Sequence, residues 1–146
     1  MMKKIILIIM LGVFCFARSN FSEPIPTFDN PRKVIFSIHT ADLKKVNATL
    51  GSMYNIQKEY PAESLHMVVV AYGKGLRILR KDFDKATKTR IKSLMQYDVE
   101  FIGCKNTMDS MHWKEKDFLD GVEFVQAGIA EIIERKVAGY IGINAY

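Results

Sequence analysis

Apolar residues recur along this chain in two alternating patterns, short continuous runs and longer stretches with helical spacing. The short runs are typical of buried strands and predict five of them, at residues 33–39, 65–72, 99–104, 122–126 and 140–143. The longer stretches predict three helices, from Leu43 to Pro61, from Asp84 to Gln96 and from Ile129 to Val137. Strands that alternate with helices of these lengths predict one α/β domain, a parallel sheet with helices on both faces.

Each predicted helix has an apolar side that we expect to face the core. These positions are Leu43, Val46, Leu50, Met53 and Tyr54 in the first helix, Ala86, Ile91, Leu94 and Met95 in the second, and Ile129, Ile132 and Ile133 in the third. Thr40 or Asp42 is suited to cap the first helix. Residues 76–79 fit a short strand or a helical turn, and residues 107–119 predict a short helix followed by a mobile loop.

The first 19 residues have the pattern of a secretory signal peptide. Lys3 and Lys4 precede an apolar run that is too short to span a bilayer comfortably, and small residues follow it, so we prefer export to a retained anchor. Phe14 argues against a lipid anchor on Cys15. We therefore expect a periplasmic or secreted protein without a stable membrane anchor. Residues 20–32 contain three prolines and predict an extended lead-in to the domain at residues 33–146.

Removal of the signal changes the charge and the cysteine inventory. Loss of Lys3, Lys4 and Arg18 reduces the 21 basic residues to 18 against 16 acidic ones, so the net charge falls from +5 to +2. A charge this small gives no reason to expect nucleic-acid binding, and the basic residues of the second helix fit a solvated face. Loss of Cys15 leaves Cys104 as the one thiol, which excludes an internal disulfide.

Cys104 stands where a short apolar strand gives way to polar residues, in the segment VEFIGCKNTM from Val99 to Met108. Asn106 and Thr107 are suited to cap a following helix, and both the amides at a helix start and Lys105 would favour the thiolate. In a parallel sheet the carboxyl ends of the strands share one edge, so we expect His39 and the Gly73–Gly75 turn beside the thiol. The alternative is an inert buried cysteine, which is common.

Three segments resemble the DsrE/DsrF-like family of small sulfur-relay proteins. They are VVVAYGKGLRIL at Val68–Leu79, VEFIGCKNTM at Val99–Met108 and GVEFVQAGIAEIIERKVAGYIGI at Gly121–Ile143. The second is the most specific, because the functional cysteine of the family follows a strand and precedes Asn-Thr-Met or a close variant. The sequence departs from the family at Tyr72, where many relatives have histidine, and at Lys136, where glutamine is common.

The resemblance implies a doubly wound, mostly parallel five-stranded sheet and assembly into trimers or hexamers. It also implies that Cys104 carries sulfane sulfur as a persulfide, taken from a donor and passed to an acceptor protein, which makes the chain a sulfurtransferase-like carrier. We expect the surrounding binding residues to be His39, Tyr72, Gly73, Gly75, Lys105, Asn106 and Thr107. An exported carrier needs a donor and an acceptor outside the cytoplasm.

A second hypothesis is a non-catalytic oligomeric protein that binds a small ligand or a partner in a strand-end cleft, lined by His39, Tyr72, Gly73, Lys74 and Cys104. The Gly73-Lys74-Gly75 turn lacks the length of a phosphate loop, so we expect no nucleotide or other cofactor. His39, His66 and His112 lie on different elements without metal-ligand spacing, so we expect no metal, and His66 in a strand is the least functional of them. Met108, Met111, His112 and Trp113, with Tyr140 and Tyr146, suggest a lid or a subunit interface, or else core packing.

Overall fold

The sheet contains five parallel strands in the order β4-β3-β2-β1-β5. We describe residues 19–144 of a computed structural model; the signal peptide predicted for residues 1–19 lies outside them except for Ser19, and so do Cys15 and Tyr146. The strands are β1 (Arg32–Ile38), β2 (Leu65–Ala71), β3 (Glu100–Cys104), β4 (Glu123–Val125) and β5 (Ile141–Asn144). The predicted strands are therefore confirmed, with boundaries shifted by at most one residue, and β1 begins at Arg32, the last residue of the predicted lead-in.

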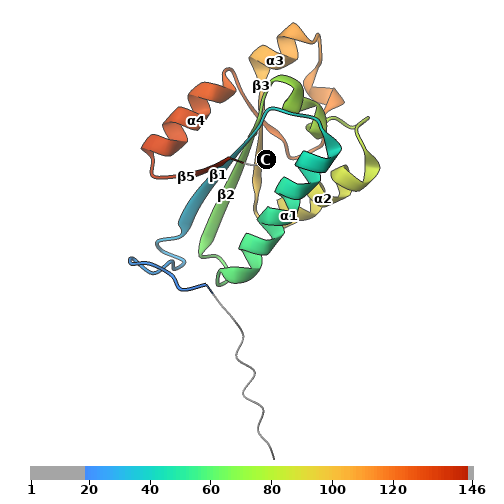
Figure 1. The fold of residues 1–146 in the computed structure, drawn as a ribbon. Coiled ribbons are helices and arrows are strands. Elements are labelled where there is room, and N and C mark those ends of the chain that lie inside the picture. The colour runs from blue at the N-terminus through green and yellow to red at the C-terminus, as the bar shows by residue number, and fades with distance from the viewer. Residues whose placement is uncertain (1–18, 145–146) are drawn as a thin grey trace, which may run out of the picture.

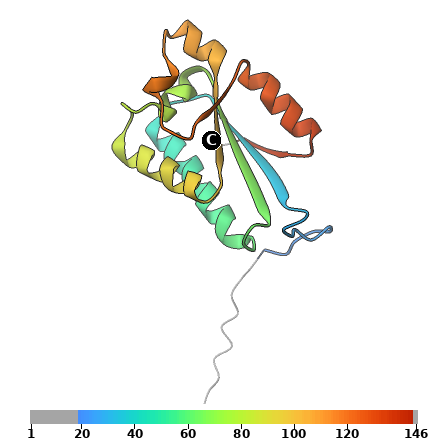
Figure 2. The same ribbon diagram turned by 180° about the vertical axis from the view of Figure 1, so that it is seen from behind.

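Helices cover both faces of this sheet (Figure 1). The α-helices are α1 (Leu43–Glu59), α2 (Lys85–Gln96), α3 (Lys105–Ser110) and α4 (Gly128–Val137), and two short 3-10 helices are η1 (Gly73–Leu79) and η2 (Glu115–Asp117). Figures 1 and 2 show α1 and α2 on one side of the sheet, α4 on the other and α3 beyond the end of β3. The doubly wound α/β fold is confirmed, and residues 76–79 form a helical turn.

Strand β2 lies in the middle of the sheet, and both of its faces are buried. Met67 and Val69 point toward the core under α1 and α2, whereas Val68 and Val70 point toward the smaller core under α4. The near-continuous apolar run of the sequence follows from this position, because each face needs an apolar side chain at every second residue.

Acidic side chains begin both long helices on the larger face. The Asp42 carboxylate accepts a hydrogen bond of 2.9 Å from the Lys45 amide, and Asp84 accepts one of 2.8 Å from the Thr87 amide. Each bond satisfies an amide that has no partner inside its helix. Asp42 is thus the cap of α1.

Four of the positions expected in the core lie outside it. Leu43 begins α1 and is 47 % exposed. Ala86 is exposed because α2 turns Thr87, Ile91 and Leu94 inward. In α4, Gly128, Ile132 and Arg135 are less exposed than Ile129 and Ile133, which are 52 % and 54 % exposed. Residues three or four positions apart share one face of a helix, and only that face packs against the sheet. An apolar residue next to such a position in the sequence therefore points away from the core.

Residues 111–119 do not form the free loop that the sequence suggested. The Lys81 amide donates to the Asp117 carbonyl at 2.8 Å, and the Leu119 amide donates to the Leu79 carbonyl at 2.9 Å. The Phe118 side chain is 1 % exposed. Many of the charged residues here face water while the segment is fastened to the end of η1.

We expect Phe118→Ala to lower the free energy of unfolding by about 3–5 kcal/mol, because it empties a core position whose neighbours cannot fully collapse. The ring of Phe118 meets those of Phe124 and Trp113 edge-on, at centroid distances of 5.3 Å and 6.0 Å. Urea denaturation measures the change. Phe28→Ala is the matched control, since Phe28 is 71 % exposed and its loss should alter stability by about 0.5 kcal/mol or less. Equal losses of stability in the two variants would contradict the burial of Phe118 in the core.

Candidate functional site

The carboxyl end of β3 places Cys104 between two neighbouring strand ends. The turn at Tyr72 and Gly73 follows β2, and Gln126 follows β4. Because all strands are parallel, these three ends share one edge of the sheet, where the sequence predicted Cys104 and the Gly73–Gly75 turn. The site is therefore built from backbone and side chains that are 20 to 34 residues apart in the chain.

Gly75 lets η1 cross close above the end of β1. A Cβ atom at this position would lie 2.1 Å from the Ile38 carbonyl oxygen and 2.8 Å from the His39 Cα. Only glycine permits such an approach between two backbones. The structure therefore gives Gly75 a packing role, whereas the sequence suggested a binding residue.

The thiol of Cys104 is nearly enclosed. The residue is 6 % exposed, and its Sγ accepts a hydrogen bond of 3.3 Å from the Gly128 amide. When protonated, the thiol also donates to the Gln126 carbonyl, with 3.8 Å between sulfur and oxygen. The segment between β4 and α4 thus contacts the sulfur directly.

The surroundings of Cys104 lower the pKa of its thiol. Burial by itself raises the pKa, because it penalises the charged thiolate. Hydrogen bonds from the Gly128 amide, from the amide and hydroxyl of Thr107 and from the Asn106 amide outweigh that penalty. The net result is a pKa below the ordinary value of cysteine, which is the property of a reactive thiol.

We expect this shift to appear in the pH dependence of alkylation. The thiolate is the reacting form, so a lowered pKa moves the rise of the rate to a lower pH than in a free cysteine, whose pKa is about 8.5. For the same reason the folded state should gain stability as the pH rises through this range, and lose it on acidification. Iodoacetamide rates on the native chain with Cys15→Ser, compared with those on the same chain unfolded in urea, measure the shift. An inflection of the rate at a higher pH in the native chain than in the unfolded chain would contradict the lowered pKa.

Thr107 and Asn106 lie in the first turn of α3 and connect Cys104 to both neighbouring segments. The Gly73 amide donates to the Thr107 hydroxyl oxygen at 3.0 Å. The Asn106 amide donates to the Gln126 carbonyl at 3.0 Å, and the Gln126 side-chain amide donates to the Asn106 Oδ1 at 2.6 Å. The two residues do not cap α3, because that helix already begins at Lys105 with Cys104 as its N-cap.

Three other residues expected at the site have their described contacts with groups other than the sulfur. The Lys105 ammonium forms an ion pair of 3.0 Å with Glu115, and amides and a hydroxyl provide the largest contributions that favour the thiolate. Tyr72 lies close, since a Cβ atom on Gly128 would be 3.5 Å from its Cβ. His39 is exposed, with its ring 6.2 Å from that of Tyr72.

Sequence reasoning missed the segment Gln126–Gly128, which supplies an amide to the sulfur and a side chain to Asn106. The available signal was a glycine between a predicted strand and the start of a predicted helix. That signal became meaningful only with the strand order, because nothing in the sequence says that β4 is the neighbour of β3.

His66 takes part in a network of side-chain hydrogen bonds that the sequence did not suggest. Its Nε2 lies 2.7 Å from Glu100 and its Nδ1 lies 2.7 Å from the Tyr140 hydroxyl. Arg135 donates to both of those partners, at 2.9 Å and 3.0 Å, and to Glu131 at 2.7 Å. This network fastens α4 to the sheet. Burial lowers the pKa of Arg135, but its hydrogen bonds to Glu131 and Tyr140 outweigh that effect and raise the pKa above the ordinary value of arginine.

The residues of the proposed interface cluster divide between the core and the surface. Met108 is buried, and Trp113 packs against Phe118 with the Arg80 guanidinium 4.5 Å from its ring centre. Tyr140 is buried as well, whereas Met111 is 44 % exposed. Within one chain, Met108 and Tyr140 are therefore core residues and Trp113 is half-buried, whereas Met111 and His112 lie on the surface. The homo-oligomer stays a prediction.

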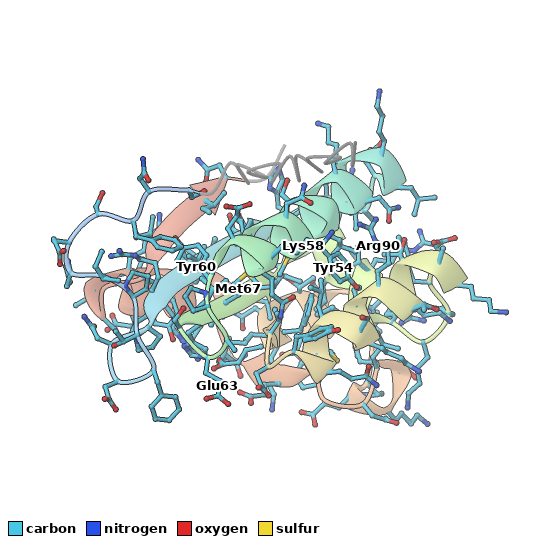
Figure 3. All side chains as sticks on the ribbon, turned by 90° about the horizontal axis from the view of Figure 1, so that it is seen from below. Tyr54, Lys58, Tyr60, Glu63, Met67 and Arg90 are labelled. Carbon is cyan, nitrogen blue, oxygen red and sulfur yellow. The ribbon has the colours of Figure 1, made fainter. Side chains whose placement is uncertain are left out.

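A cavity of about 240 Å³ lies at the opposite edge of the sheet, where the strands begin. Tyr60, Glu63 and Met67 line it, and an adjoining hollow is lined by Tyr54 and Lys58 (Figure 3). It is not the strand-end cleft of the second hypothesis, since Cys104 ends β3 at the other edge.

Two further observations concern residues 19–144 alone. No three His, Cys, Asp or Glu side chains in this part of the chain come together in an arrangement that could hold a metal ion. None of the helices described here has the length and apolar character needed to cross a membrane.

Comparison with known proteins agrees with this fold. Residues 33–144 match the model of the DsrE/DsrF-like family. The protein of unknown function MTH1491 from Methanobacterium thermoautotrophicum has a similar structure, with a TM-score of 0.72 and 28 % identity over 77 % of this chain and 98 % of its own. The YchN protein of E. coli has a TM-score of 0.63 and 11 % identity over the same shares, and so supports the fold alone. No curated protein matches the sequence. The family match covers most of the chain, so this protein belongs to the DsrE/DsrF-like family.

Proposed function

We propose that this protein carries sulfane sulfur as a persulfide on Cys104. Membership in the family suggests a sulfur-relay role. The observation that carries the finer proposal is the environment of the thiol. Cys104 lies at a strand end, its sulfur accepts a hydrogen bond from the Gly128 amide, and the pKa of the thiol is lowered. A thiol held in this way is prepared to act as a nucleophile.

The transfer is an exchange between sulfur atoms. The Cys104 thiolate attacks the outer sulfur of a donor persulfide, R–S–SH; the new sulfur–sulfur bond forms as the old one breaks, and the donor leaves as R–S⁻. A thiolate of the acceptor then attacks the outer sulfur of the Cys104 persulfide and releases Cys104 as a thiolate. The overall exchange needs no external oxidant or reductant.

Thiolate stabilisation serves both halves of this exchange. The amides that hold the negative charge on Cys104 increase the thiolate fraction before loading, and they stabilise the same thiolate as the leaving group during delivery. A single thiol suffices for a carrier. We further propose that the carrier works outside the cytoplasm, in agreement with the signal peptide predicted for residues 1–19, and that its donor and acceptor are found there.

Intact-mass spectrometry after exposure to a persulfide donor tests the function. We expect a gain of one sulfur atom, about 32 Da, that reductant removes and alkylation traps. A chain that stays unloaded, under conditions that load an established persulfide carrier, would refute the proposal.

A further inference from the structure

The thiol of Cys104 lies beneath a strap formed by residues 126–128. The Gly128 amide donates a hydrogen bond to its sulfur, and a Cβ atom on Gly128 would be 3.2 Å from the Cys104 Cβ. Cys104 is 6 % exposed in this arrangement. A sulfur atom covered by backbone cannot be approached by the thiol of another protein, so a carrier in this state cannot deliver its cargo.

Two hydrogen bonds between Asn106 and Gln126 hold the strap in place. One joins the Asn106 amide to the Gln126 carbonyl at 3.0 Å, and the other joins the Gln126 side-chain amide to the Asn106 Oδ1 at 2.6 Å. Both residues are exposed, so water competes for the same groups. Neutral hydrogen bonds in contact with water contribute modestly to stability, and a closure held by them can open without unfolding the domain.

We propose that Asn106 and Gln126 form a latch that determines which reaction partners reach Cys104. This inference rests on the proposed function, because delivery to a second protein is what requires the strap to open. The closed latch excludes bulky reactants more strongly than small ones. The acceptor is a protein that replaces the hydrogen bonds of Asn106 and Gln126 with its own as it docks.

Two maleimides of different size test the latch, since a thiolate adds to the same double bond in both. N-ethylmaleimide is the small reagent and N-(1-pyrenyl)maleimide the bulky one, used on the full chain with Cys15→Ser so that Cys104 is the reacting thiol. We expect Gln126→Ala to accelerate the reaction with the bulky reagent about three- to tenfold, as loss of one hydrogen bond would, and the reaction with the small reagent less.

The pH dependence of both rates separates access from acidity. Opening the latch raises the plateau rate that is reached when the thiol is fully ionised, whereas a change of pKa only moves the inflection. Asn106→Ala should have the same effect as Gln126→Ala, and the double variant should be no faster than either single one, because all three lack the same bond. Asn55→Ala is the matched control, an exposed amide on α1, and should leave both rates unchanged.

Unchanged plateau rates, an unchanged ratio between the two reagents, or additive effects in the double variant would overturn the latch. Thermal melts of every variant confirm that the domain remains folded. Maleimide addition needs no persulfide, so failure of this proposal is distinct from failure of sulfur loading, which the mass measurement reports separately.

Discussion

Cys104→Ser should abolish persulfide loading completely. A hydroxyl at this position cannot ionise near neutral pH, and it forms no bond to sulfane sulfur, so the added 32 Da should be absent. The fold should persist, because serine is close in size to cysteine. Its hydroxyl can accept the Gly128 N–H and donate to the Gln126 carbonyl, the two contacts of the present sulfur.

Cys15→Ser provides the matched control for this variant, since Cys15 is the other cysteine of the full chain. It should load as the unaltered chain does. Thermal melts of Cys104→Ser should show a change in stability of about 1 kcal/mol or less, which separates lost chemistry from lost structure. Loading that persists in Cys104→Ser, and disappears in Cys15→Ser, would overturn the assignment of the reactive thiol.

Gly75→Ala should destabilise the domain by about 3–5 kcal/mol, among the larger effects of a single methyl group. The added Cβ would lie 2.1 Å from the Ile38 oxygen and 2.5 Å from the Ile38 carbonyl carbon. Both are backbone atoms, so no side-chain rotation relieves the overlap, and η1 must move away from the end of β1. Urea denaturation measures the loss.

Gly51→Ala is the control of opposite sign. Gly51 lies inside α1, and the nearest atom to an added Cβ is the end of the Arg90 side chain at 3.5 Å, an ordinary contact. Alanine should therefore stabilise the helix by about 0.5–1 kcal/mol, since it restricts the unfolded chain. A loss of stability at both positions, or at neither, would contradict the steric explanation for Gly75.

The α/β architecture could be predicted because it depends on patterns that are local in the sequence. The buried run of β2, the carboxylate of Asp42 before α1, and the alternation of strands with helices each indicated the elements that the structure contains. The faces of short helices were less predictable. In α4 apolar residues come in adjacent pairs, and only packing against the sheet decided that Ile132 lies inward of Ile133.

The sequence by itself determined the α/β fold, the position of Cys104 at a strand end, and the nearness of Asn106 and Thr107 to its sulfur, because these follow from residues adjacent in the chain. The tertiary structure alone decided the environment of the thiol. Its Gly128 amide, the Gln126 contact with Asn106 and the Gly73 contact with Thr107 all come from segments 20 or more residues away. Strand order brings those segments together, and strand order results from the packing of the whole sheet.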